Sequence, residues 1–205
     1  MNKYIEYAKA FINWIRKKIV YDNTQQAGDE SQLAAGDWSQ PVAGNRSKLA
    51  AGNWSQLTAG DESQLAAGDW SKLATGDESQ LATGDESQLA AGDESQLAAG
   101  DGSKLAAGYG SQLAAGDRSK LAAGYESQLV AGIWSQLEVG ERGIAMGDHG
   151  SKAKGKLGSA IVLCEREEYP SRNIRHIKAG IIDGKKLKPD TWYKLKDGEF
   201  TEITI

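Results

Sequence analysis

Glycine recurs at every eighth residue over more than half of this chain, and this spacing constrains the fold more than any other feature. Fifteen successive glycines, from Gly28 to Gly140, keep the interval. Counted from Ala27, the unit is Ala-Gly-Asp-x-Ser-Gln/Lys-Leu-Ala, and it runs fourteen times to Glu138. A fixed internal period of this kind indicates a repeat architecture in which each unit buries its apolar side chains against its neighbours.

A helix is the first alternative to test, because Ala, Leu, Gln and Glu are good helix formers. Eight residues turn an α-helix by about 800°, so the repeated Leu would drift around its surface. A strand has a period of two, and eight is even, so every Leu stays on one face. Ser and Leu are then expected to point inward, and Gln/Lys and the following Ala outward. Gly-Asp supplies the corner, since Gly tolerates positive φ and Asp can bond nearby backbone N–H groups.

One octad is too short to close a coil around a core, but two octads form two strands and two corners. The aromatic residues support this doubling, because they recur at sixteen residues. They are Trp38, Trp54 and Trp70 in alternate octads, which we call one parity. Trp134 lies in an octad of the same parity, and Tyr109 and Tyr125 lie in octads of the other parity. We therefore predict an all-β repeat fold, a β-solenoid of about seven 16-residue coils.

The flanks of the repeat are expected to cap the solenoid, because an uncapped end would add further strands. Residues 1–26 are predicted to form an N-terminal α-helical cap, with an amphipathic helix over about 3–20. The solenoid itself is assigned to 27–140. The octad register is expected to slip after Gly140, so that 141–205 hold one irregular coil and a small β-rich C-terminal cap. The strands predicted there are 159–167, 173–179, 192–196 and 199–205.

Charge and composition exclude several classes of partner. Residues 27–140 hold 6 basic and 16 acidic side chains, a net charge of −10, whereas each flank has a net charge of +3. An acidic rod argues against nucleic acid along the repeat. The chain has neither a long apolar span nor a cleavable signal, so we expect no membrane span and favour a cytoplasmic location. One Cys and two His argue against a disulfide framework or a zinc finger.

The polar residues that could carry chemistry have simpler structural interpretations. A row of Asp could suggest calcium, but an octad with one Gly differs from the calcium-binding nonapeptide, so we assign these residues to corner turns. The row comprises Asp29, Asp37, Asp61, Asp69, Asp77, Asp85, Asp93, Asp101 and Asp117. His149 and His176 lie outside the regular coils with no nucleophile marked nearby, and Cys164 lies in an apolar strand. The sequence therefore predicts no catalytic, cofactor-binding or metal site, and no enzyme.

The aromatic rows are the best candidates for an interaction surface. Three Trp stacked along one corner would expose a continuous apolar strip, which is typical of a contact with a partner. We predict that two copies of the chain pair through the Trp row, or through Tyr109 and Tyr125. A homo-oligomer, with a dimer favoured, is the expected state.

The octad resembles the repeats of bacterial ice nucleation proteins. Segments such as Ala43-Gly44-Asn45-Arg46-Ser47-Lys48-Leu49 carry the likeness, which covers about 27–138 and is closest to that family's C-terminal coils of the Arg-Ser-Lys-Leu type. The resemblance implies a β-solenoid of 16-residue coils, and C-terminal coils of that family support assembly into fibres. It also implies that Tyr109 and Tyr125 occupy positions comparable to stacked Tyr proposed to join solenoids.

One departure from that family changes the functional expectation. Its water-organising coils carry Thr-x-Thr outward, whereas here the sixth position is Gln or Lys in all fourteen octads, and the eighth is Ala except for Val42, Thr58, Val130 and Glu138. We therefore expect a non-enzymatic, self-associating structural protein. An ice-binding or weakly ice-nucleating protein is the second hypothesis. A fibre or adhesin segment whose C-terminal domain binds a ligand is the third.

Overall fold

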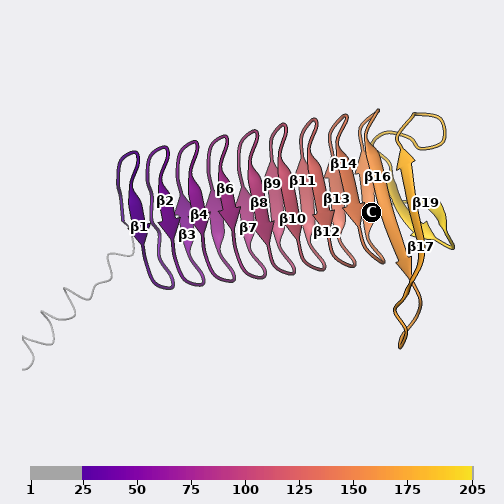
Figure 1. Ribbon diagram of the computed structural model, residues 1–205, viewed down its shortest axis with the longest axis horizontal. Helices are drawn as coiled ribbons and strands as arrows, with labels where there is room; N and C mark the ends of the chain where they lie inside the picture. Colours follow the sequence, from indigo (N-terminus) through magenta and orange to yellow (C-terminus); the bar gives the residue numbers. More distant parts are fainter. Residues whose placement is uncertain (1–24, 205) are drawn as a thin grey trace, which may run out of the picture.

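The computed structural model describes residues 25–204, which form an all-β solenoid of about eight stacked parallel coils (Figure 1). The predicted N-terminal helix over 3–20 lies outside the described residues. The first strands are β1 (Gln32–Ala34), β2 (Lys48–Ala50), β3 (Gln56–Thr58), β4 (Gln64–Ala66), β5 (Lys72–Ala74), β6 (Gln80–Ala82), β7 (Gln88–Ala90), β8 (Gln96–Ala99), β9 (Lys104–Ala107) and β10 (Gln112–Ala115). They are followed by β11 (Lys120–Ala123), β12 (Gln128–Ala131), β13 (Gln136–Val139), β14 (Ile144–Gly147), β15 (Lys152–Gly155), β16 (Ala160–Arg166), β17 (Ile174–Ile181), β18 (Trp192–Lys196) and β19 (Glu199–Ile203).

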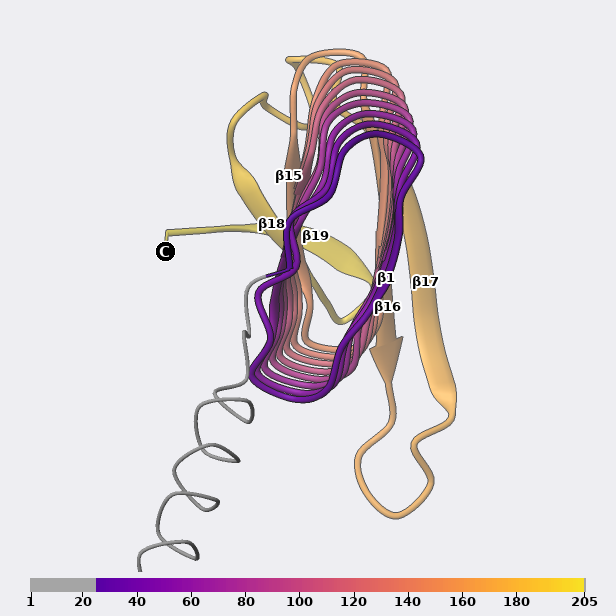
Figure 2. The same ribbon diagram turned by 90° about the vertical axis from the view of Figure 1, so that its left-hand side faces the viewer.

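Successive strands alternate between two sheets that face each other across a narrow interior (Figure 2). The first sheet has the order β1-β2-β4-β6-β8-β10-β12-β14-β16-β17, and the second has the order β19-β18-β15-β13-β11-β9-β7-β5-β3. Within the coils each strand pairs in parallel with the strand sixteen residues away, as Gln112 does with Gln128. The predicted 16-residue coil is confirmed.

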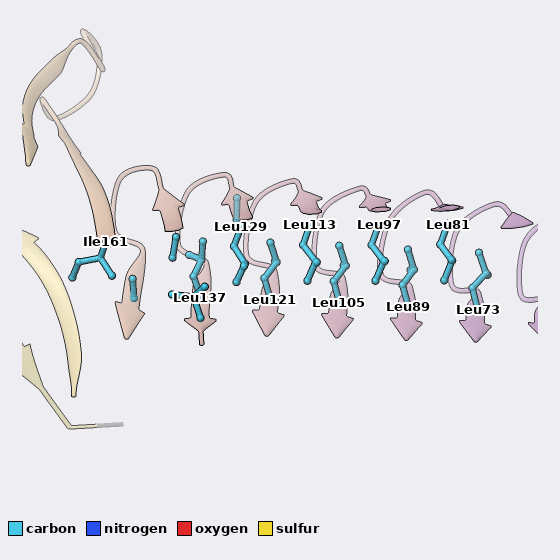
Figure 3. Close-up of a cluster of buried hydrophobic side chains, with 14 of the residues drawn as sticks. Leu73, Leu81, Leu89, Leu97, Leu105, Leu113, Leu121, Leu129, Leu137 and Ile161 are labelled. Atoms are coloured by element: carbon cyan, nitrogen blue, oxygen red, sulfur yellow. The ribbon is translucent and has the colours of Figure 1, made fainter. Parts of the chain in front are cut away.

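The interior is filled by the two residues of each octad that were expected to point inward. The repeated Leu from Leu49 to Leu137 are buried, and those of the two sheets meet along the rod axis (Figure 3). The Ser two positions earlier is buried as well, while the Gln or Lys between them is exposed. This alternation is the strand periodicity that the even repeat length predicts.

The buried Ser hydroxyls form a ladder that links each coil to the next. Ser79 N–H donates to Ser95 Oγ at 3.2 Å, and Ser95 Oγ–H donates to the carbonyl of Asp93 at 3.1 Å. The same N–H to Oγ bond, across sixteen residues, recurs from Ser31 to Ser151 except at Ser127, where Gly143 takes the place of the next Ser. A buried hydroxyl without partners would be unfavourable, so the ladder allows a polar residue to occupy one inward position of each octad.

The corner is built differently from our expectation. None of the fifteen repeat glycines has a positive φ; the left-handed residue is instead the fourth of the octad. Glu, Trp and Arg adopt φ values there between 52° and 61°, and Gly102 and Gly110 adopt 67° and 64°. The idea that the repeat Gly supplies the positive φ is therefore wrong.

From Gly44 onward the repeat Gly is required because the preceding coil lies too close for a side chain, whereas Gly28 and Gly36 in the first coil have open space there. A Cβ on Gly92 would lie 1.8 Å from Asp77 Oδ1 and 2.9 Å from Asp77 N. That Oδ1 already accepts a hydrogen bond from Asp93 N–H at 2.8 Å, in the next coil. The Asp row therefore links coil to coil instead of bonding within its own turn, and Asn45 and Asn53 do the same.

The octad register does not slip after Gly140, contrary to our prediction. Ile144 pairs with both Gln128 and Ala160, so the 16-residue offset continues to β16. The residue types change because the interior is filled in a different way: Ala145 replaces the inward Leu, while Val139 and Leu163 are buried at the first position of their octads. The volume lost where Ala replaces Leu is restored by larger side chains at the first octad position, so the coil geometry is retained.

Antiparallel strands end both parallel stacks at the C-terminal end. β17 pairs with β16, β18 pairs with β15, and β19 completes a hairpin with β18. The four strands predicted beyond residue 158 are confirmed. Ile182, Leu187 and Tyr193 belong to the same buried cluster as the repeated Leu, so this segment covers the last coil of the core.

Two threonines at the first position of their octads point inward, and their hydroxyls have no hydrogen-bond partner in the described part of the chain. Among the described residues, the Oγ1 atoms of Thr75 and Thr83 are buried without a hydrogen-bond partner. Thr75→Val keeps the volume and removes the hydroxyl, so we expect the free energy of unfolding to rise by about 1 kcal/mol. Urea unfolding followed by circular dichroism measures this change. The exposed Thr58→Val is the control, and a less stable Thr75→Val variant would contradict the assignment.

Candidate self-association surface

Trp38, Trp54 and Trp70 form a stack along one corner of the solenoid, which we call the Trp edge. Each occupies the fourth, left-handed position of its octad; Trp54 and Trp70 come just before β3 and β5 of the second sheet, and Trp38 comes before the isolated bridge at Val42. Ring centroids are 5.1 Å apart between Trp38 and Trp54 and 5.0 Å apart between Trp54 and Trp70, and the planes differ by 6° and 5°. The spacing of the coils thus brings the rings into face-to-face contact.

The Trp edge exposes a large apolar surface. Trp38 is 61% exposed, and Trp54 and Trp70 are each 45% exposed. Because each ring covers the face of the next, the stack presents mainly ring edges to a partner. A groove of about 540 Å³ runs beside it and is also lined by polar side chains, including Gln56, Lys72 and Gln88.

Trp134 does not extend this stack, although it shares the parity of the other three. Glu86, Gly102 and Arg118 occupy the intervening fourth positions. Trp134 instead meets His149 edge to face, with ring centroids 5.7 Å apart. Its ring also lies against the backbone of Gly150, where a Cβ would be 2.6 Å from the indole.

Tyr109 and Tyr125 stack on the opposite corner, with ring centroids 5.6 Å apart. Both rings have further partners within the chain. The Tyr109 hydroxyl donates to Glu126 Oε2 at 3.2 Å, and this hydrogen bond to a carboxylate raises the pKa of Tyr109. Arg142 lies 5.4 Å from the centre of the Tyr125 ring, within cation–π range. The Tyr pair therefore offers a second copy less surface to contact than the Trp edge does.

A cluster of ionisable groups near the last coil was not predicted from the sequence. Arg166 donates from Nε and Nη2 to the Asp148 carboxylate, and the hydrogen bonds hold the pKa of Asp148 below its usual range. The Arg166 N–H donates to His149 Nδ1 at 3.0 Å. Burial, with the Asp148 carboxylate second, raises the pKa of the Cys164 thiol. Each polar group thus has a partner that fastens β16 to the preceding corner. The sequence did contain a signal for this cluster, because Asp148 and Cys164 are sixteen residues apart and therefore occupy the same position in adjacent coils.

The remaining expectations about sites concern metals and membranes. Across residues 25–204, no three His, Cys, Asp or Glu side chains are grouped closely enough to hold a metal ion. The described part of the chain also contains no helix long and apolar enough to cross a membrane.

Comparison of the chain with models of protein families, with curated proteins and with solved structures gives no match.

Proposed function

We propose that this chain is a non-enzymatic structural protein whose copies associate through the Trp edge. The observation that supports this proposal is the stack of Trp38, Trp54 and Trp70, because the three stacked rings remain 45% to 61% exposed. Exposed apolar patches of this kind are typical of protein–protein contacts, where Trp is enriched and often dominates the binding energy.

The electrostatics of the rod favour an apolar contact over an ionic one. The net charge of −10 over 27–140 makes parallel or antiparallel rods repel each other. The Trp edge places three uncharged side chains at one corner, whereas the opposite corner carries Glu30, Arg46, Glu62, Glu78 and Glu94 at the same position. Two copies can therefore approach Trp edge to Trp edge with less repulsion than at the opposite corner.

The fold suits a structural role. Hydrogen bonds between coils along the Ser and Asp rows make a rod whose surface features repeat at a constant spacing. The assignment to coils that resemble the C-terminal coils of ice nucleation proteins remains part of this proposal, as does a helical N-terminal cap. The β-rich segment from β17 to β19 is the proposed C-terminal cap.

Light scattering coupled to size exclusion of the full chain tests the proposal. We expect Trp38/Trp54/Trp70→Ala to lower the average mass relative to the unsubstituted protein at the same concentration. The matched control is Glu30/Glu62/Glu78→Ala, which changes the fourth position at the opposite corner and is expected to leave association at least as strong. An unchanged mass for the Trp variant would exclude the Trp edge as the contact.

A further inference from the structure

The outward faces of the two sheets differ sharply in charge. In the coils of the second sheet, from β3 to β15, six of fourteen outward side chains are charged; these are Lys72, Lys104, Lys120, Glu138, Lys152 and Lys154. At the same two octad positions of the first sheet, the sixth and eighth from β1 to β16, one of eighteen side chains is charged, namely Lys48; Arg166, at the end of β16, is paired with Asp148. A chain with 25% charged residues thus has one nearly uncharged face. Depletion of charge is typical of the centre of a protein interface.

The outward face of the first sheet, which we call the neutral face, has regular rows of long and short side chains. The Gln row stands beside the Ala row along β1, β4, β6, β8 and β10, and a groove of about 960 Å³ runs between and over them. A row of long side chains next to a row of short ones is self-complementary, because the Gln of one copy can lie over the Ala of another. The rows repeat with the coil spacing of about 4.8 Å, so a partner with the same repeat matches along the whole face.

The C-terminal end of this face is apolar. Val130, Ile144 and Met146 replace Gln and Ala on β12 and β14 and are exposed. On β17, Ile177 pairs with Cys164 and Ile181 with Ala160, so both lie on the same outward side, and they are 62% and 65% exposed. The patch is continuous with the neutral rows and supplies the strongest hydrophobic contact of the face.

We infer that the outward face of the first sheet, from β1 to β17, binds a second copy of this chain by face-to-face packing. The inference rests on the proposed self-association, because its partner is a second copy of the chain, but it uses a different surface. The face is roughly 40 Å by 12 Å, or about 500 Å² per copy. A contact of about 1,000 Å² in total is at the lower limit for a specific interface. The pairing is therefore weak, and it adds to the Trp edge to allow assemblies larger than a dimer.

The test places charge on either face of the full-length rod at matched positions. Ala82→Lys/Ala114→Lys changes the first sheet, and Ala90→Lys/Ala122→Lys changes the same octad position on the second sheet, where all four Ala are exposed. The masses are measured by light scattering over a concentration series, and circular dichroism checks that each variant keeps its fold. We expect the first-sheet variant to weaken face pairing by at least about tenfold and the control to behave like the unsubstituted chain.

Combination with the Trp variant separates the two surfaces. With both contacts present, we expect the unsubstituted chain to reach a mass above that of a dimer. Either variant alone is expected to form a dimer, and the combined variant a monomer of 21.9 kDa. If the Trp variant has no effect while the first-sheet variant is monomeric, the face contact stands and the Trp edge fails. An unchanged assembly for the first-sheet variant, or an equal loss for the second-sheet control, would overturn the face contact.

Discussion

Replacing Gly140 by Ala is expected to lower the free energy of unfolding by about 3 kcal/mol, enough to disrupt the coils around it. A Cβ at this position would lie 2.5 Å from the carbonyl carbon of Gly124, 2.6 Å from its oxygen and 2.7 Å from Tyr125 N. All three are backbone atoms of the preceding coil, so relief requires the two coils to separate. Urea unfolding followed by circular dichroism measures the loss.

Gly110→Ala is the matched control for Gly140→Ala. Gly110 has a φ of 64°, but its Cβ would meet the nearest atom, Glu94 Cγ, at an ordinary distance of 3.4 Å. Glu, Trp and Arg occupy this fourth position in other octads with a positive φ. The strain of a left-handed Ala is about 1 kcal/mol. Equal losses for the two variants would contradict the conclusion that close coil packing requires the repeat Gly.

Replacing Leu105 by Ala is expected to lower the free energy of unfolding by about 3 kcal/mol. The side chain is 2% exposed and lies between Leu89 and Leu121 in the second sheet. The Ser and Asp hydrogen bonds on either side hold the coils at a fixed spacing, so the cavity cannot collapse fully. The same unfolding experiment measures this change.

Leu157→Ala provides the comparison, because Leu157 is 55% exposed at a corner. We expect its loss to stay below about 1 kcal/mol. A Leu105→Ala variant no less stable than Leu157→Ala would show that the Leu row contributes little and that hydrogen bonds alone hold the rod.

The periodic part of the fold could be predicted from the sequence because one number, eight, decides strand parity. The inward positions of Ser and Leu followed directly from it, whereas the 16-residue offset followed from the spacing of the aromatic residues. The role of the repeat Gly could not be predicted in this way, because a corner has two places where Gly is useful. In the folded chain the positive φ belongs to residues such as Trp54, and Gly92 lies against Asp77 of the preceding coil.

The end of the repeat was missed because the sequence pattern changed while the geometry did not. Ala145 in place of Leu reads as a break, but its loss of volume is balanced by Val139, six residues earlier. The stack of Trp38, Trp54 and Trp70 was predictable from their spacing, whereas the separate position of Trp134 depends on its contact with His149. The neutral face of the first sheet was detectable too, since every Lys at the sixth position except Lys48 falls in the octads that form the second sheet.

Sedimentation equilibrium of the full chain at increasing NaCl concentration tests most directly whether acidic rods associate through apolar surfaces. Raising the ionic strength from about 0.1 M to 1 M shortens the Debye length from about 10 Å to about 3 Å and so weakens repulsion between rods. We predict an average mass above 21.9 kDa that increases with salt. A single species of 21.9 kDa at every salt and protein concentration, or an assembly that dissociates as salt rises, would contradict the account.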